Sequence, residues 1–141
     1  MTNKNPNITI LGFDPGRDKC GIAIREPDGK IACHQVVTAE AAIPSLQSLC
    51  QQFPVELIVM GNQTTAKQWK QQLEAELGTT FPIVMVDERN SSLEARDHYW
   101  QIYPPQGLTR LIPPGMRLPP RPIDDIVAIL LIERYLNRPL Q

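Results

Sequence analysis

The sequence feature that most constrains the fold is a short, fully apolar run, Leu57-Ile-Val-Met60, which follows a segment of helical periodicity. A run of this length and composition is typical of a strand buried on both faces, and such strands occur mainly in parallel sheets covered by helices. Apolar residues recur at helical spacing from Ile43 to Phe53 before the run, and Gly61 ends it. The pattern predicts a helix and then a buried strand, which is a unit of an α/β fold.

Three runs rich in Ile, Val and Ala precede this unit, at residues 8–13, 21–25 and 30–37. Gly and Asp residues separate the runs, and Glu26-Pro-Asp-Gly29 is a typical turn sequence between the second and the third. We therefore expect the chain to begin with three consecutive strands in an antiparallel meander.

Helices and strands are also predicted to alternate in the second half of the chain. Residues 66–77 carry apolar side chains at helical spacing after the capping box Thr65-x-x-Gln68, and Gly78 follows where a C-terminal glycine belongs. Residues 82–86 form another buried strand, and the capping box Ser91-x-x-Glu94 opens a further helix. This alternation implies that part of the sheet is parallel.

A proline-rich segment at residues 104–122 separates this helix from the last one. It contains seven of the fourteen prolines, three arginines and no acidic residue, so we expect a long basic loop without regular structure. Structureless connections of this length are uncommon and are usually functional or mobile, although a proline-stiffened surface tie is the simpler alternative. Residues 126–136, apolar on nearly every side, predict a final helix buried against the sheet.

Length and charge bound the class of protein. The 141 residues are sufficient for one core, so we expect a single domain over residues 1–141. The net charge of -1 removes the simplest argument for nucleic-acid binding, yet seven of the nine arginines lie from Arg89 onward, beside five acids. The basic C-terminal third would suit a polyanion. No apolar run is long enough to span a membrane and no secretory signal is visible, so a soluble, cytoplasmic protein is expected.

Acidic residues lie where three of the predicted elements begin or end. Asp14 directly follows the first strand in a D-x-G turn, Glu88 follows the strand at 82–86, and Asp124 and Asp125 open the last helix. A single sheet can bring these positions to one edge. Gathered carboxylates repel one another unless a cation lies between them, and ligand sets made only of oxygen favour Mg²⁺ or Mn²⁺. Two such ions can clamp the attacking water and the leaving oxygen of a phosphodiester.

Each acid also has a simpler interpretation. Asp14 can be a turn residue that accepts backbone hydrogen bonds, and Glu88 with Arg89 can be a solvated pair at a strand end. Asp124 and Asp125 can cap the last helix and complement its dipole. The coincidence of all three acidic positions at element ends of one expected edge favours the functional interpretation.

Three motifs in this order resemble the YqgF family, also called RuvX, of Holliday junction resolvases. They are the D-x-G turn at Asp14, Val86-Asp-Glu-Arg-Asn-Ser-Ser-Leu-Glu-Ala95, and Ile123-Asp-Asp-Ile-Val-Ala128 leading to Ile132-Glu-Arg-Tyr-Leu136. In detail the chain is most similar to the cyanobacterial variant. The resemblance implies a ribonuclease H-like α/β fold: a five-stranded mixed sheet, three antiparallel strands and then two parallel ones, with helices on both faces. It also implies a metal-dependent nuclease related to RuvC, acting on branched DNA or on the ends of pre-16S ribosomal RNA.

The resemblance also assigns roles to individual residues. It makes Asp14, Glu88 and Asp124 the catalytic metal ligands for Mg²⁺ or Mn²⁺, with Asp125 as the alternative to Asp124. RuvC-type resolvases carry an acid at the end of the fourth strand, where this chain has none, so Glu88 must reach in from the neighbouring strand. The expected nucleic-acid-binding residues are polar or basic and lie near these acids or in the proline-rich segment: Arg17, Lys19, Asn62, Gln63, Thr64, Arg89, Arg110, Arg117 and Arg121.

Three hypotheses of function follow from the sequence. The leading one is a metal-dependent endonuclease, a hydrolase of structured RNA or branched DNA with a role in ribosome biogenesis or junction resolution, and a homodimer would suit cleavage of two strands. The second is a nucleic-acid-binding or ribosome-assembly module that keeps the fold without efficient catalysis. The third, an ATPase fragment of the actin and sugar-kinase type, is disfavoured because that fold needs two such domains.

Overall fold

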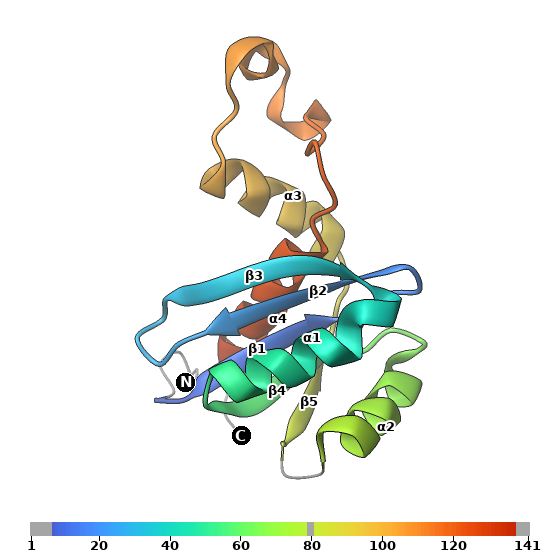
Figure 1. Cartoon of the computed structure of the whole chain (residues 1–141). Coiled ribbons are helices and arrows are strands. Elements are labelled where there is room, and N and C mark those ends of the chain that lie inside the picture. Colours follow the sequence, from blue (N-terminus) through green and yellow to red (C-terminus); the bar gives the residue numbers. More distant parts are fainter. Residues whose placement is uncertain (1–6, 79–80, 138–141) are drawn as a thin grey trace.

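A computed structural model describes residues 7–78 and 81–137; the outer ends of the predicted domain 1–141 lie outside these ranges. The elements follow the order expected from the sequence (Figure 1). They are β1 (Thr9–Asp14), β2 (Lys19–Arg25), β3 (Ile31–Thr38), α1 (Ala39–Gln52), β4 (Val55–Gly61), α2 (Ala66–Leu77), β5 (Ile83–Val86), α3 (Ser91–Ile102) and α4 (Asp124–Asn137).

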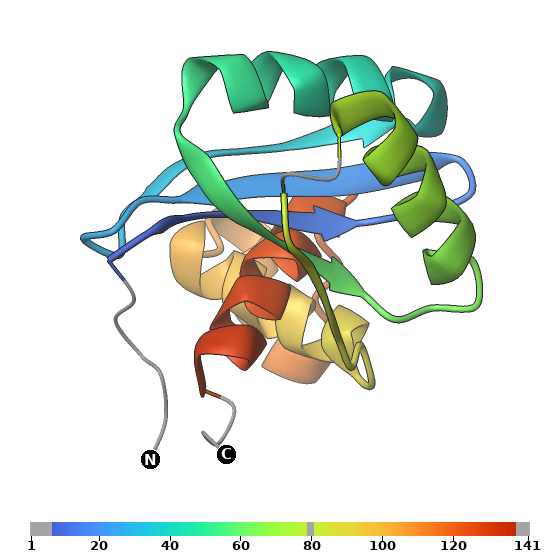
Figure 2. The same cartoon turned by 90° about the horizontal axis from the view of Figure 1, so that it is seen from below.

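The five strands form one mixed sheet in the order β3-β2-β1-β4-β5. β1, β2 and β3 pair as an antiparallel meander, and β4 and β5 extend the sheet in parallel with β1. Helices α1 and α2 lie on one face, while α4 covers the other and α3 packs against α4 on that side (Figure 2). The predicted fold class, a five-stranded mixed sheet with helices on both faces, is confirmed.

Two hydrophobic cores lie on the two faces of the sheet. Alternate residues of the central strand β1 serve different cores: Ile10 faces α4, and Leu11 and Phe13 face α1 and α2. The edge of the Phe13 ring packs against Trp69 of α2 at a centroid distance of 5.3 Å. Helix α4 is buried along almost its whole length because the sheet covers one side and α3 packs on another. No helix in the described part of the chain is long and apolar enough to cross a membrane.

The start of α2 is as predicted, whereas Ser91, the predicted cap of α3, is instead the first residue of that helix; neither capping box is formed. Thr65 and Asn90 occupy the cap positions of α2 and α3, and neither side chain makes a capping hydrogen bond. Asn90 adopts a left-handed conformation with φ of 60°, which Asn tolerates better than most residues. The last helix begins at Asp124, so Asp124 and Asp125 open it as predicted.

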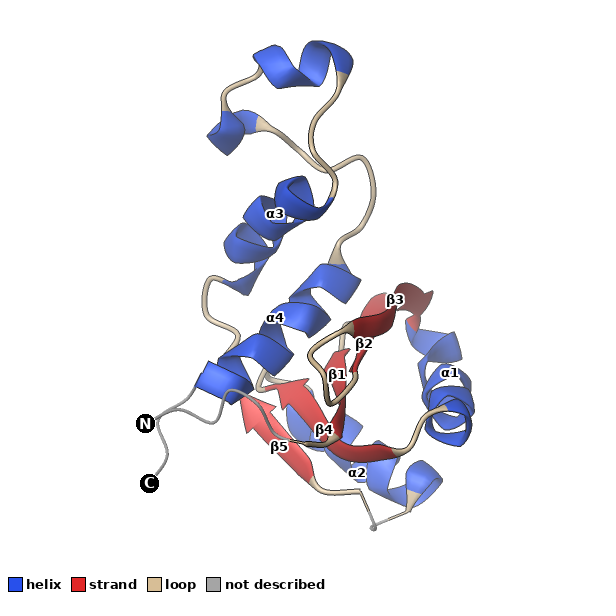
Figure 3. Cartoon of the chain, turned by 90° about the vertical axis from the view of Figure 1, so that its left-hand side faces the viewer, coloured by secondary structure: helices blue, strands red, loops and turns tan. Residues whose placement is uncertain are grey.

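The proline-rich segment is partly regular, so the prediction that it lacks regular structure is wrong. It contains two short 3-10 helices at Gly107–Leu111 and Pro114–Met116. Proline suits the first position of such a turn because its missing N–H has no partner to lose there. Figure 3 shows the segment extending beyond the ends of α3 and α4, away from the sheet.

Candidate active site

Asp14 marks the centre of the candidate site. It is the last residue of β1, only 6% exposed, and pairs with Gly21 of β2. The parallel neighbour β4 ends at Gly61, one residue beyond the pair Phe13 and Met60. The carboxyl ends of β1 and β4 therefore meet at one edge of the sheet, where functional residues of open α/β sheets commonly gather.

Glu88 reaches this edge from the adjacent strand. It follows β5, whose last residue, Val86, pairs with Gly61. The Glu88 carboxyl group lies against the Gly61 backbone so closely that a Cβ atom at position 61 would overlap it. Gly61 thus makes room for an acid at the end of β4, although the strand carries none of its own.

Asp124 enters the site through the first turn of α4. Its backbone carbonyl lies against Gly21, where any Cβ atom would overlap it. This close approach brings the N-terminus of α4 down onto the sheet beside the pair formed by Asp14 and Gly21. Sequence patterns indicated glycine at the D-x-G turn, but nothing local marked Gly21 or Gly61 as spacers, because their partners are distant in the chain.

Burial raises the cost of ionising all three carboxyl groups, and Asp14 is also affected by the other two acids. Burial, and then the neighbouring Glu88 and Asp124, raise the pKa of Asp14 far above its ordinary value. Burial also raises the pKa of Glu88 and of Asp124, although the nearby Lys19 ammonium partly offsets the shift at Asp124. Asp14 Oδ1 and both Glu88 carboxyl oxygens are buried and accept no hydrogen bond. A bound cation would stabilise the negative charge on these oxygens.

The donor set fits a hard divalent cation, since Mg²⁺ and Mn²⁺ prefer carboxylate oxygens. Within residues 7–78 and 81–137, no three His, Cys, Asp or Glu side chains are already close enough to hold a metal ion together. A cation shared by Asp14, Glu88 and Asp124 would need these side chains to lie closer together than they do here.

Asp125 is engaged elsewhere. Its Oδ2 lies 2.6 Å from His34 Nδ1 on β3, and its Oδ1 accepts a hydrogen bond of 3.0 Å from Arg121. Burial alone would raise the pKa of Asp125, but these two partners outweigh it and lower the pKa. Arg121 in turn lies over the rings of Tyr99 and Tyr103, at 5.4 and 5.8 Å. Because both carboxyl oxygens of Asp125 already have partners, Asp124 is the better candidate of the two adjacent acids for a metal ligand.

Replacing Asp125 with asparagine is expected to lower the free energy of unfolding at pH 6 by about 1–3 kcal/mol, because two charge-assisted hydrogen bonds are weakened. The lowered pKa means that this contribution is present above the ordinary value of 3.8 and is lost as the pH falls below it. Urea denaturation at several pH values measures the difference. Glu56→Gln, on an exposed residue of β4, is the control; a difference that stayed constant down to pH 2 would contradict the ion pair.

Arg134 of α4 fixes the turn that carries Glu88. Its guanidinium donates hydrogen bonds of 2.7 Å to the backbone carbonyls of Asp87 and Arg89, and another of 2.9 Å to Glu94 Oε1. The two residues that flank Glu88 are therefore tied to the last helix. The sequence showed Arg134 only as part of the C-terminal motif, and its partners 45 and 47 residues away became visible only in the fold.

The predicted nucleic-acid-binding residues fall into three places. Arg17 is exposed on the turn after β1, Lys19 is exposed at the start of β2, and Asn62, Gln63 and Thr64 are exposed after β4, so these residues border the acids. Gln63 lines a shallow hollow with Glu88 and the start of α3. The side chain of Arg89 lines a different hollow, with Glu94 and Arg134. Arg110, Arg117 and Arg121 belong to the projecting segment.

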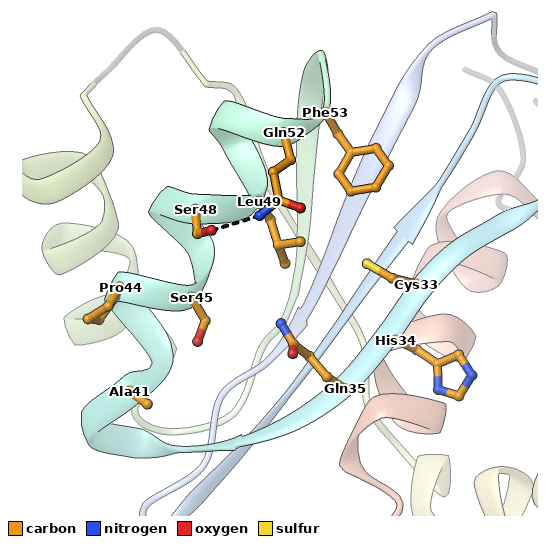
Figure 4. Close-up of a pocket in the computed structure, with 10 residues that line it drawn as sticks. All are labelled: Cys33, His34, Gln35, Ala41, Pro44, Ser45, Ser48, Leu49, Gln52 and Phe53. Atoms are coloured by element: carbon orange, nitrogen blue, oxygen red, sulfur yellow. Dashed lines mark hydrogen bonds between the residues drawn. The ribbon is translucent and has the colours of Figure 1, made fainter.

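A larger cavity, of about 590 Å³, lies between β3 and α1 and has no acidic lining residue (Figure 4). Cys33 and Gln35 point towards it, whereas His34 points away, towards α4 and Asp125. Cys33 is a free thiol, as are Cys20 and Cys50, and burial raises the pKa of each. The cavity carries no group suited to metal-assisted hydrolysis.

The sheet order, the helices on both faces and the acids at one edge define an RNase H-like protein. The fold is similar to that of RuvC from Thermus thermophilus, with a TM-score of 0.54, 15% identity, and coverage of 88% of this chain and 90% of that one. The family model of RuvX, described as Holliday junction resolvase, matches residues 8–138. The chain belongs to the RuvX family.

Relatives of similar length support this assignment. A protein of Coxiella burnetii (strain Dugway 5J108-111), named as a candidate pre-16S rRNA nuclease, is 26% identical over 152 residues, covering 94% of this chain and 95% of its own. A protein of the same name from Legionella pneumophila (strain Lens) is 25% identical over 151 residues, covering 94% of this chain and 98% of its own.

Proposed function

We propose that this protein is a divalent-metal-dependent endonuclease that hydrolyses phosphodiester bonds in structured nucleic acid. One observation carries the proposal. Asp14 and Glu88 have buried carboxyl oxygens that accept no hydrogen bond, and they lie at the edge of the sheet where Asp124 is also found. Groups of like charge in this position destabilise the fold unless a cation neutralises them. Asp14, Glu88 and Asp124 would hold Mg²⁺ or Mn²⁺, which activates water and stabilises the leaving oxygen when bound.

The residues around the acids suit phosphate binding. Arg17 lies on the β1–β2 turn, Lys19 at the start of β2, and Asn62, Gln63 and Thr64 in the loop after β4. Lysine acts there as a point charge and arginine as a bidentate fork for phosphate oxygens. Arg134 keeps the Glu88 turn in place, which fixes the position of one ligand relative to the bound strand.

The substrate class follows from the family and the relatives. Precursor 16S ribosomal RNA and four-way DNA junctions are the two candidates, and the names of the relatives favour processing of the RNA. Both substrates are structured polyanions that occur in the cytoplasm of a bacterium. A symmetric dimer would present two acidic sites to the two strands of a junction, and sedimentation in the presence of junction DNA measures that state.

Cleavage of a labelled panel tests the proposal: an RNA spanning a 16S precursor end, a four-way DNA junction and a linear duplex, each with Mg²⁺, Mn²⁺ or EDTA. We expect one structured substrate to be cut with metal and none with EDTA. Binding without any cleavage would instead support the second hypothesis, a nucleic-acid-binding or ribosome-assembly module whose affinity depends on salt and which has no turnover.

Metal binding is expected to raise the melting temperature of the wild-type protein at pH 7.5, because an ion relieves the repulsion among the buried carboxylates. The shift should be several degrees at saturating Mn²⁺ and should be absent from Asp14→Asn. Differential scanning calorimetry with and without EDTA measures it. Glu56→Gln serves as the control and should respond to Mn²⁺ as the wild type does; an equal shift for Asp14→Asn would remove Asp14 from the ligand set.

A further inference from the structure

The segment between α3 and α4, residues 103–123 and here called the arm, carries most of the large apolar side chains that are exposed in the described part of the chain. Of the eight large hydrophobic residues that are most exposed in the described chain, six lie in the arm. Four of them, which we call the tip residues, are 71–82% exposed: Leu108, Leu111, Met116 and Leu118. A cluster of this kind on a protein with two well-filled cores indicates an interaction surface.

The arm is held in its projecting position by specific contacts. At its base, Arg121 lies over Tyr99 and Tyr103 and is paired with the buried Asp125. Farther out, Arg96 of α3 donates a hydrogen bond of 3.3 Å to the Gly115 carbonyl. Within the arm, Arg117 donates to the carbonyls of Ile112 and Arg110, at 2.9 and 3.3 Å. These contacts hold the arm in one conformation before it binds, which lowers the conformational entropy lost on binding.

The charge of the arm favours a polyanion as its occupant. No acidic residue lies between Asp97 and Asp124, and Arg110, Arg117 and Arg121 fall in that interval. A second copy of the arm would carry the same positive charge and repel the first. The arm also leads directly into Asp124, so a nucleic acid bound at the acidic edge passes the base of the arm.

We propose that the arm is a wedge that places its aliphatic tip residues against uncovered faces of base pairs at a branch point or helix end. This inference rests on the proposed function and refines its substrate class. Leucine, methionine and proline are residues that proteins insert between base steps, while flanking arginines contact phosphates. A branch point or helix end already exposes base faces, whereas a continuous duplex must first be unstacked. The arm therefore selects branched or terminated helices over uninterrupted ones.

Binding measured in Ca²⁺, without reference to cleavage, tests the wedge. The assay measures binding to a labelled four-way junction, with relaxed closed-circular duplex as competitor. It compares the wild type with a variant in which all four tip residues are replaced: Leu108→Ser, Leu111→Ser, Met116→Ser and Leu118→Ser. We expect the wild type to prefer the junction by about tenfold or more and the variant to lose most of that preference. Its affinity for the closed duplex should change less than about twofold, because the arginines remain.

Two further measurements separate the outcomes. Arg110→Gln is expected to weaken junction and closed duplex alike and to reduce the salt dependence of both, as loss of a phosphate contact does. Circular dichroism verifies that the serine variant, altered only at exposed positions, keeps its fold. The proposal is overturned if the serine variant keeps the junction preference, or if sedimentation shows that the tip residues instead hold two copies together. These experiments measure binding and not cleavage. A protein that cleaves nothing would therefore contradict the proposed nuclease activity, whereas the wedge is tested by the binding affinities.

Discussion

Replacing Asp14 with asparagine is expected to abolish metal-dependent cleavage, with a loss of about 10³-fold or more, while the fold is retained. Asparagine keeps the shape of the side chain but removes the charge that would hold the ion. A discontinuous assay with the preferred substrate of the panel measures the loss, and the Glu56→Gln variant, altered at an exposed carboxylate of β4, should keep full activity.

The same substitution should stabilise the metal-free protein at neutral pH. The pKa of Asp14 is raised, so the folded state favours the protonated form, and stability falls as the pH rises above the ordinary value of 3.8. A neutral asparagine does not ionise and escapes that loss, which gives a gain on the order of 1 kcal/mol at pH 7 in EDTA. Chemical denaturation from pH 4 to pH 8 should show the two proteins diverging as the pH rises; a variant that is less stable throughout would contradict the buried-repulsion argument.

Replacing Gly61 with alanine should also inactivate the enzyme, by about 100-fold, although position 61 supplies no functional group. The new methyl group overlaps the Glu88 carboxyl and forces that side chain out of the site. An initial-rate assay measures the loss, and the far-ultraviolet circular dichroism spectrum verifies the fold. A loss of ligand placement of this kind typically costs 10–100-fold in metal-dependent activity.

A paired substitution distinguishes displacement of Glu88 from a general disturbance of β4. Glu88→Ala alone should be inactive because the carboxylate is missing. Combining it with Gly61→Asp returns a carboxylate to nearly the same place, since a Cβ at position 61 would occupy the space of the Glu88 carboxyl group. The double variant should recover a measurable part of the lost activity. If it folds and binds Mn²⁺ but cleaves no better than Glu88→Ala, the acid must reach the site from β5 and not from β4.

The fold could be predicted from the sequence because each element carries a local signal. Apolar periodicity marked α1 and α2, and the run at Leu57–Met60 marked a strand covered on both faces. The order of the predicted strands and helices then restricted the sheet to few possible topologies. The capping box of α3 was mispredicted because the motif specifies residue types only, whereas in the structure Asn90, with its left-handed backbone, takes the cap position in front of Ser91.

The candidate site was predictable only in part. Asp14, Glu88 and Asp124 stood out because each lies where an element begins or ends. The partners of Asp125 could not be predicted, since His34 lies 91 residues away and no local pattern links the two. For the same reason the roles of Gly21, Gly61 and Arg134 could not be predicted: their importance lies in what approaches them after folding.

The way the site is divided along the chain has a consequence for synthesis of the protein. Asp14 and Glu88 emerge from the ribosome before Asp124, which arrives on α4, after every other described element. α4 also fills the core under β1 and β2, so its docking and the completion of the acidic edge are a single event. The three acids therefore come together only when α4 docks, so a partly folded chain in which α4 is not yet in place lacks the complete acidic edge.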